Sequence, residues 1–181
     1  YYASDLDEST WIVLFKLNSL PPSSYRYKIF GSDTHEMSIF VKDDGRIGFR
    51  HQVNKNLYSD YYASPNEWVF FSTSVKYVSQ TKIEYLFFAN GQSWSGYLES
   101  DGLNYDNSYS GYRIAHDSIW QGVYTDGLVA LAIKYYKFLT LDEIQKIYEN
   151  PMNPITDGLV LWLNFHNIQD NIVPDLSGYG N

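Results

Sequence analysis

The sequence contains no cysteine, and this absence excludes a disulfide framework and every cysteine–zinc site. Positive charge is scarce as well, because 13 lysine and arginine residues stand against 21 aspartate and glutamate residues, for a net charge of −8. No basic patch interrupts this acidic background, so we expect no nucleic-acid partner. No apolar run approaches the roughly twenty residues of a membrane helix, so we expect no membrane span in this chain.

Enzyme motifs are missing too. The four histidines are scattered and include no HExxH pair. A glucanase needs two or three carboxylates spaced along one strand, and no predicted strand has this pattern. Glu99 and Asp101 stand in a stretch rich in glycine and serine, where solvated loop carboxylates are the ordinary interpretation. Because no phosphate-binding loop is recognisable either, we predict no catalytic residues and no enzymatic activity.

Aromatic residues are abundant, with 18 tyrosines and 10 phenylalanines among 181 residues. They favour β-strands, and the length suits a single β-sandwich. Apolar runs bounded by turn residues predict strands at 11–17, 25–30, 38–42, 46–50, 68–75, 82–88, 113–115 and 128–138. We interpret residues 51–65 as a weak strand with a loop, and residues 93–111 as a long loop with a short strand.

Turn and helix signals complete the pattern. Asp44-Gly45 and Asn90-Gly91 are typical of tight hairpin turns. Thr140 stands three residues before Glu143, the spacing of a capping box, and Asn150-Pro151 stops the helix that this box begins. Strands without alternating helices argue against a parallel sheet. The prediction is an all-β protein, an antiparallel jelly-roll β-sandwich with one short helix near residues 140–150.

A predicted strand with tyrosines near its end is followed by a helix that reads Leu-Thr-x-x-Glu-Ile-x-x-x-Tyr from Leu139 to Tyr148. This motif resembles the end of a laminin-G-like repeat of the concanavalin A-like lectin/glucanase superfamily. Four further segments match the family in the expected order, and together they cover roughly residues 9–150: Trp11 to Leu17, Met37 to Phe49, Asn66 to Trp68, and Asn90 to Gln92. The resemblance implies that Trp68 is a buried core residue.

The last segment resembles the beginning of such a repeat, in Gly158 to Phe165 and Asp175 to Asn181. We therefore expect residues 1–150 to form a sandwich that lacks its own first strand, and residues 151–157 to be a linker. Residues 158–181 would be the opener of a next repeat, completing either the same sandwich or a neighbouring one. The chain begins at Tyr1 without methionine, so we expect a processed product or an excerpt.

Calcium is the only cofactor that the sequence suggests, in a structural role. Asp175 matches an acidic residue that family members use, but Ala130-Leu131 replaces their acidic pair on the last strand. Asp101 and Asp106 belong to a separate oxygen-rich cluster of the kind that hard cations prefer. Asp and Asn are also ordinary loop residues, so the alternative of no cofactor stays open.

Sugar binding is the main functional hypothesis. Aromatic side chains stack on sugar rings while neighbouring polar groups bond the hydroxyls. The alternative for each aromatic residue is packing on the sheet surface. The candidates, all placed in or beside predicted loops, are Tyr58, Tyr61, Tyr62, Trp94, Tyr105, Tyr109, Tyr112 and Trp120.

These observations favour a non-catalytic module of a larger cell-surface or virion protein that adheres to glycans or to a surface protein. The resemblance favours an extracellular location. The alternative is a structural repeat that assembles with copies of itself into a filament or array by strand exchange. A glycoside hydrolase is the third and weakest hypothesis.

Overall fold

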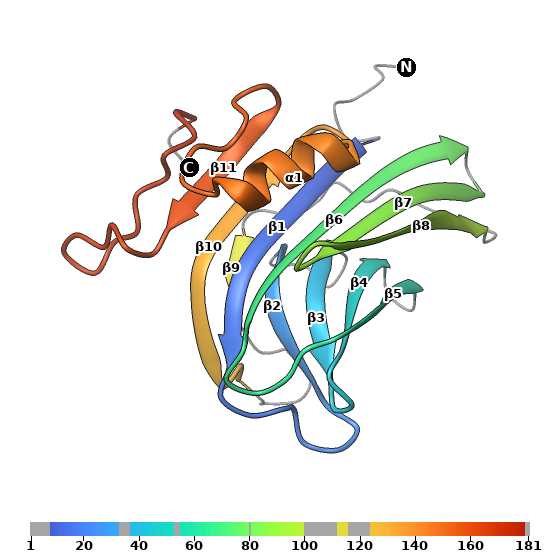
Figure 1. Cartoon of the computed structure of the whole chain (residues 1–181), viewed down its shortest axis with the longest axis horizontal. Helices are drawn as coiled ribbons and strands as arrows, with labels where there is room; N and C mark the ends of the chain where they lie inside the picture. Colours follow the sequence, from blue (N-terminus) through green and yellow to red (C-terminus); the bar gives the residue numbers. More distant parts are fainter. Residues whose placement is uncertain are drawn as a thin grey trace. The chain divides into compact units, whose positions relative to one another are not determined.

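A computed structural model of the chain describes residues 8–32, 37–52, 55–79, 81–99, 112–115 and 124–179. The described residues form a six-stranded sheet, a five-stranded sheet and one helix, α1 (Leu141–Glu149) (Figure 1). The six-stranded sheet has the order β11 (Leu159–Asn164), β10 (Gly127–Tyr135), β1 (Glu8–Leu17), β6 (Trp68–Ser79), β7 (Lys82–Ala89) and β8 (Gln92–Glu99). The five-stranded sheet has the order β5 (Lys55–Tyr62), β4 (Arg46–Gln52), β3 (Ser38–Lys42), β2 (Arg26–Ser32) and β9 (Tyr112–Ile114).

The hairpin pairs in both sheets are antiparallel, as in β6–β7, β7–β8, β2–β3 and β3–β4. The fold class is therefore the all-β antiparallel sandwich with one short helix that the sequence predicts. The chain divides into two compact units. One unit contains α1, β7, β8 and β11, and the other contains β2 to β5 and β9, while β1, β6 and β10 contribute to both. The described part of the chain holds no helix with the length and apolarity that crossing a membrane requires.

The predicted turn residues adopt the backbone conformations that their hairpins need. Asn90 and Gly91, between β7 and β8, have φ angles of 43° and 89°. Positive φ at both central residues is the signature of a two-residue hairpin loop that matches strand twist. Gly45, before β4, has φ 86°, and a Cβ there would approach the Ala63 carbonyl oxygen to 2.7 Å. Only glycine fits this turn without strain.

Several strand predictions are wrong in extent. β1 begins at Glu8 rather than at residue 11, β6 continues to Ser79, and the strand predicted at 128–138 ends at Tyr135. The weak strand predicted within 51–65 is β5, with eight residues. β8 lies where a long loop with only a short strand was predicted, and its eight residues pair continuously with β7 from Lys82↔Glu99 to Ala89↔Gln92. Serine and glycine give this segment low strand propensity. It is nevertheless a strand because β7 offers it a complete hydrogen-bonding edge, and such tertiary context overrides propensity.

Helix α1 has the predicted cap. The Thr140 hydroxyl accepts a hydrogen bond from the Glu143 amide at 3.4 Å, and the Glu143 carboxylate accepts one from the Thr140 amide at 2.8 Å. Each residue satisfies an amide that the first helical turn leaves without a partner, so this confirms the capping box. Lys137 adds an ion pair to Glu143 at 2.9 Å. The helix ends at Glu149, before Pro151, as predicted.

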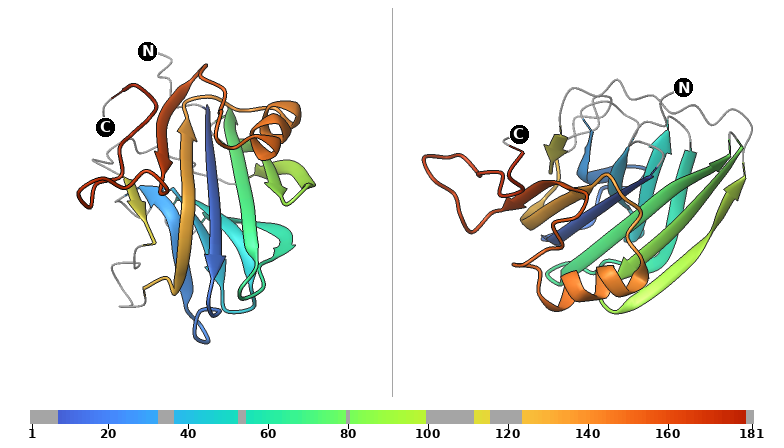
Figure 2. Two further views of the ribbon diagram at one scale, coloured as in Figure 1. Left: turned by 60° about the vertical axis from the view of Figure 1, so that its left-hand side comes forward. Right: turned by 90° about the horizontal axis from the view of Figure 1, so that it is seen from above.

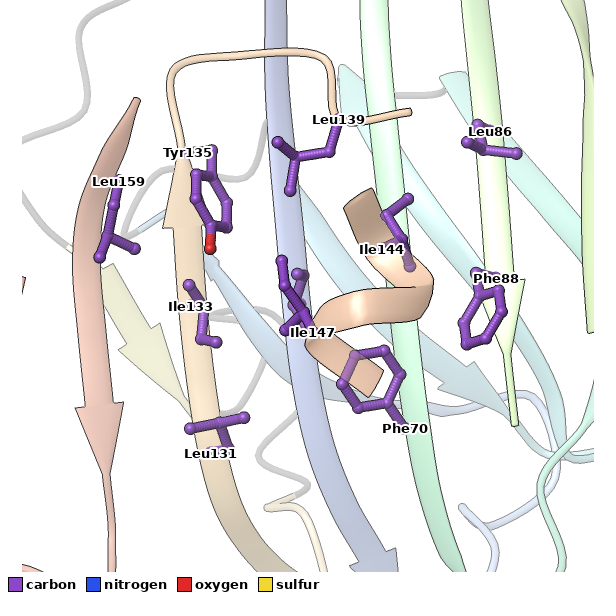
Figure 3. Packing of buried hydrophobic residues seen from close by; sticks show 11 residues of the cluster. Phe70, Leu86, Phe88, Leu131, Ile133, Tyr135, Leu139, Ile144, Ile147 and Leu159 are labelled. Carbon is purple, nitrogen blue, oxygen red and sulfur yellow. The ribbon is translucent and has the colours of Figure 1, made fainter. Parts of the chain in front are cut away.

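One face of α1 covers one face of the six-stranded sheet, over β1, β6 and β7 (Figures 1 and 2). Ile144 and Ile147 are buried among side chains of five strands (Figure 3), namely Ile12, Phe70, Leu86, Phe88, Leu131, Ile133, Tyr135 and Leu159. Tyr148 adds ring contacts to Phe70 and Phe88, with centroids 5.1 and 5.2 Å away. Each fully buried isoleucine contributes about 1.5–3 kcal/mol relative to exposure, so this packing anchors the helix more strongly than its cap does.

Two buried hydroxyls fix the loop between β10 and α1. Thr10 Oγ1 donates to the Lys137 carbonyl at 2.7 Å and accepts from the Leu139 amide at 2.9 Å. Ser74 Oγ donates to the Leu139 carbonyl at 3.1 Å. The loop thus reaches β1 and β6 through side chains instead of a sheet ladder, which sets where the helix starts.

The C-terminal strand β11 pairs antiparallel with β10 of the same chain, from Leu131↔Asn164 to Tyr135↔Leu159. Its Leu159, Val160 and Leu161 are buried. This pairing gives the apolar edge of β10 a hydrogen-bonded neighbour, which an open edge strand would lack.

The prediction that Trp68 is a core residue is wrong. Trp68 is 45% exposed, and the Lys16 ammonium lies 5.4 Å from its ring centroid. Val69 is the buried residue, because successive strand residues point to opposite faces. Trp11 on β1, at 0% exposure, is a fully buried tryptophan.

Candidate functional site

The strand registers place a group of cations and aromatic rings on one face of the five-stranded sheet. Residues directly opposite each other in an antiparallel pair share a face. The pairs on this face are Arg26↔Lys42, Lys28↔Phe40, Ser38↔Arg50, Phe40↔Gly48, Gly48↔Tyr58, Arg46↔Tyr62 and Arg50↔Asn56. We call this surface the cationic–aromatic face and define it by Arg26, Lys28, Phe40, Lys42, Arg46, Arg50, Asn56, Tyr58 and Tyr62. The alternate residues of the same strands, such as Ile39, Val41, Ile47, Phe49 and Leu57, are buried.

Phe40 forms the base of this face. A Cβ at Gly48 would approach Phe40 Cζ to 2.5 Å, so the missing side chain leaves the space that the phenyl ring occupies. Tyr58 stands edge-on against Phe40, with centroids 5.8 Å apart and an interplanar angle of 88°. The Arg26 guanidinium lies 4.8 Å from the Phe40 centroid. Edge-to-face and cation–π contacts of this kind hold the rings in defined orientations.

Arg46 joins the two exposed tyrosines. Its Nε and Nη2 both donate to the Tyr62 hydroxyl, at 3.0 and 2.6 Å. Its guanidinium carbon lies 5.3 Å from the Tyr62 ring centroid and 5.9 Å from that of Tyr58. The hydrogen bond to Tyr62 raises the pKa of Arg46 above its ordinary value. Tyr58 and Tyr62 are 41% and 48% exposed, so their rings are open to a ligand while Arg46 limits their motion.

The turn between β3 and β4 positions the cations at one end of the face. Asp44 accepts hydrogen bonds from the Arg46 amide at 3.0 Å and from the Lys42 ammonium at 3.1 Å. The hydrogen bond from the Arg46 backbone amide is the main cause that lowers the pKa of Asp44. Lys42 also lies 5.9 Å from the Tyr58 centroid, the same distance as Arg46. Two cations therefore stand beside one exposed ring.

Charge on this face differs from that of the whole chain. The face carries five cationic residues, Arg26, Lys28, Lys42, Arg46 and Arg50, out of the 13 in a chain of net charge −8. Lys28 is only 8% exposed and donates to the Ser32 carbonyl, so it serves the fold. The remaining four cations have two carboxylates near them, since Asp44 bonds Lys42 and the exposed Asp60 on β5 acts on Arg46, so the positive charge of this surface is partly balanced.

The structure brings together two of the predicted sugar-binding residues, Tyr58 and Tyr62. Tyr61, on the same strand, is half-buried. Tyr112 lies on β9 with its ring 6.3 Å from Phe30, and Trp94 lies on β8 opposite Phe87, both half-buried. Three further candidates, Tyr105, Tyr109 and Trp120, lie outside the described residues.

The predicted calcium residues are not brought together in the described structure. Asp175 Oδ1 accepts from the amides of Trp162 and Ser177, both at 2.9 Å, and Oδ2 accepts from the Ser177 hydroxyl at 2.7 Å. This carboxylate thus ties the C-terminal segment to β11. Asp101 and Asp106 lie outside the described residues. Among residues that are described, no group of three His, Cys, Asp or Glu side chains is placed to hold a metal ion.

Sequence reasoning missed the cationic half of the site. The signal was present as alternation, because Arg26 and Lys28, Phe40 and Lys42, and Arg46, Gly48 and Arg50 are each spaced two residues apart within apolar strands. Such spacing puts each set on one face of its strand. Which strands lie side by side, and hence that the sets merge, became visible only in the sheet order.

No protein-family model matches the sequence, and no curated protein does. Solved structures do match. A candidate carbohydrate-binding protein from Bacteroides ovatus superposes with a TM-score of 0.68 at 16% identity, over 96% of this chain and 50% of that one. A heptameric SAP-like pentraxin from Limulus polyphemus gives 0.56 at 19% identity, over 78% and 70%. A tailspike protein from an Escherichia coli O157:H7 bacteriophage gives 0.58 at 11% identity, over 90% and 24%.

At these identities the likeness shows the fold. The first two proteins share a jelly-roll-like β-sandwich with this chain, which agrees with the predicted fold class. The chain spans half the length of the Bacteroides ovatus protein. The finer assignment to laminin-G-like repeats stays a prediction.

Proposed function

We propose that this chain is a non-catalytic carbohydrate-binding module whose binding surface is the cationic–aromatic face. The observation that carries the proposal is the exposure of two tyrosine rings, Tyr58 and Tyr62, held beside Arg46 by hydrogen bonds and ring contacts. A planar exposed ring accepts the apolar face of a sugar, and adjacent donors bond its hydroxyls.

Preorganisation supports the same function. Binding costs less when side chains are ordered before the ligand arrives. Tyr58 is braced by Phe40, and Tyr62 by Arg46, so neither ring must be immobilised by the sugar alone. The description of the Bacteroides ovatus protein as carbohydrate-binding agrees with this proposal. We extend it to adhesion at a cell or virion surface, as part of a larger protein.

Glycan-array screening of the whole chain, followed by calorimetry on the best neutral and acidic oligosaccharides, tests the proposal. Double substitution Tyr58→Ala/Tyr62→Ala should weaken binding at least tenfold, which corresponds to about 1.4 kcal/mol. Tyr179→Ala is the matched control, because Tyr179 is 69% exposed and lies outside the face. An array without any bound glycan, or a double variant that binds as the parent does, would overturn the proposal. Release of reducing ends from the bound glycan would contradict its non-catalytic part.

A further inference from the structure

We infer that the cationic–aromatic face selects glycans bearing carboxylate or sulfate groups. The inference rests on the proposed glycan binding and adds the charge class of the ligand. Its basis is the placement of Arg26, Lys42 and Arg46 around the Phe40–Tyr58 ring pair.

Arg26 and Lys42 form a like-charge pair directly across β2 and β3. Like charges in this position repel each other and destabilise a sheet. Within the described residues no carboxylate lies at ion-pair distance from Arg26, whose contacts are the Asn56 side-chain oxygen at 3.4 Å and the Phe40 ring. Lys42 has Asp44 at 3.1 Å, but both side chains are more than a third exposed, so water weakens this pair. An anion placed over Arg26 and Lys42 removes the repulsion.

The ring positions put such an anion within reach of a stacked sugar. Lys42 and Arg46 both lie over the Tyr58 ring, 5.9 Å from its centroid, so an acidic substituent of a sugar that contacts this ring comes within reach of both. Arg26 stacks on Phe40, which contacts Tyr58 edge-on. Guanidinium groups bind carboxylate and sulfate through paired, charge-assisted hydrogen bonds. A stacked sugar with an acidic substituent satisfies both the ring and the cations.

The net charge of the chain restricts the ligand further. A total of −8 repels long polyanions, while the local cations attract a short acidic stretch. We therefore assign the site to a few acidic sugar residues of a glycan and not to nucleic acid. Both attraction and repulsion weaken as salt screens them.

Calorimetry with four short probes tests this assignment: a galacturonate hexamer, its methyl ester, a heparin-derived hexasaccharide and a cellohexaose. The ester has the same sugar backbone as the hexamer, with an uncharged methyl ester in place of each carboxylate. We expect the galacturonate hexamer to bind roughly tenfold more tightly than its methyl ester, or the heparin hexasaccharide roughly tenfold more tightly than cellohexaose. The affinity of the acidic probe should fall as salt rises. The galacturonate arm reports carboxylate recognition and the heparin arm sulfate recognition.

Arg26→Gln/Lys42→Gln should abolish the preference for acidic probes, so that the ratio of acid to ester affinity falls to about one. Lys82→Gln/Lys146→Gln, which removes two lysines outside the face, is the control and should change nothing. The single variant Arg26→Gln, expected to change the preference in the same direction, serves if the double variant does not fold.

Equal binding of the ester and the acid, together with heparin binding no more tightly than cellohexaose, would overturn the inference and leave the carbohydrate-binding function standing. Unchanged acidic preference in Arg26→Gln/Lys42→Gln would overturn it as well. If oligothymidylate binds as tightly as the acidic sugars, the face attracts polyanions in general and does not select acidic glycans, which would also overturn the inference. No binding to any sugar, acidic or neutral, would refute the proposed function itself.

Discussion

Two sheet surfaces of this protein carry aromatic rings and have opposite surroundings. On the six-stranded sheet, Phe70 and Phe88 are at most 2% exposed beneath α1 (Figure 3). On the five-stranded sheet, Tyr58 and Tyr62 are more than 40% exposed. The neighbours of the rings make the difference. An amphipathic, capped helix supplies apolar side chains to the first surface, whereas cations and hydroxyls around the second keep it hydrated.

This contrast teaches that aromatic content alone does not identify a binding surface. The chain has 18 tyrosines; among those that the structure describes, Tyr27 and Tyr135 are buried, whereas Tyr97 and Tyr179 are exposed outside the cationic–aromatic face. A ring is available to a ligand where charged partners hold it at the surface, as Arg46 holds Tyr62. Substitutions on the covered surface should therefore lower stability, whereas substitutions on the exposed surface should mainly weaken binding.

The largest difference in the free energy of unfolding should come from truncating one ring on each surface. Phe88→Ala removes a fully buried ring that contacts Phe70 and Tyr148, and should lower the free energy of unfolding by about 3–5 kcal/mol. Tyr58→Ala should lower it by less than about 1 kcal/mol, because water already reaches the ring. Denaturant titration measures both. Equal losses would show that the two surfaces do not differ as described.

Lowering the pH should destabilise the fold through a histidine on the buried face of the five-stranded sheet. His51 is 1% exposed, and burial lowers the pKa of its imidazole to about 4 from the ordinary 6.5. Between pH 6.5 and about 4 the unfolded chain takes up a proton that the folded chain does not. The free energy of unfolding should therefore fall with decreasing pH across this window, by up to roughly 3 kcal/mol.

His51→Gln should flatten that part of the pH profile, measured by urea denaturation at successive pH values. His166→Gln, at an exposed position, is the control and should leave the slope unchanged. A slope that persists in His51→Gln would assign the acid sensitivity to other groups.

A smaller effect should follow from releasing the loop before α1. Thr10→Val keeps the side-chain shape but leaves the buried Leu139 amide without its acceptor, which costs about 1–3 kcal/mol. Thr81→Val, at an exposed turn, should cost much less. Hydrogen exchange at the Leu139 amide gives a local readout. Unaltered protection there would mean that the helix does not depend on this loop.

The smallest expected effect concerns the helix cap. Thr140→Ala removes the acceptor for the Glu143 amide and should lower the free energy of unfolding by about 1 kcal/mol. Glycan binding at the cationic–aromatic face should stay as in the parent chain. Thermal unfolding together with calorimetry tests both parts, and a change in affinity would indicate that the covered surface influences the exposed one.

The sequence identified features in which neighbours along the chain decide the outcome. Thr140, Glu143, Ile144 and Ile147 predict the capped helix, because its cap and its apolar face depend on spacings of three and four residues. Asn90-Gly91 predicts its turn for the same reason, since the demand for positive φ is local. The alternation of short apolar runs likewise predicts an antiparallel β-sandwich.

The sequence failed where the environment of a residue in the folded sheet differs from what its own type or family likeness suggests. β8 is a strand because β7 pairs with it, whereas its own serine and glycine content does not predict a strand. Trp68 was assigned to the core through its resemblance to a family tryptophan, whereas the pleat turns it outward and buries Val69.

The candidate site divides along the same line. From the sequence alone, Tyr58 and Tyr62 were two of eight candidate sugar-binding residues, and the spacing that alternates Arg26, Phe40, Lys42 and Arg46 with core residues is a property of the sequence itself. Only the tertiary structure decided that these residues meet on one surface, because the order β5-β4-β3-β2 and the registers between those strands bring them side by side. Strand order depends on the total burial of apolar side chains across the whole sheet, and no short stretch of sequence contains that quantity.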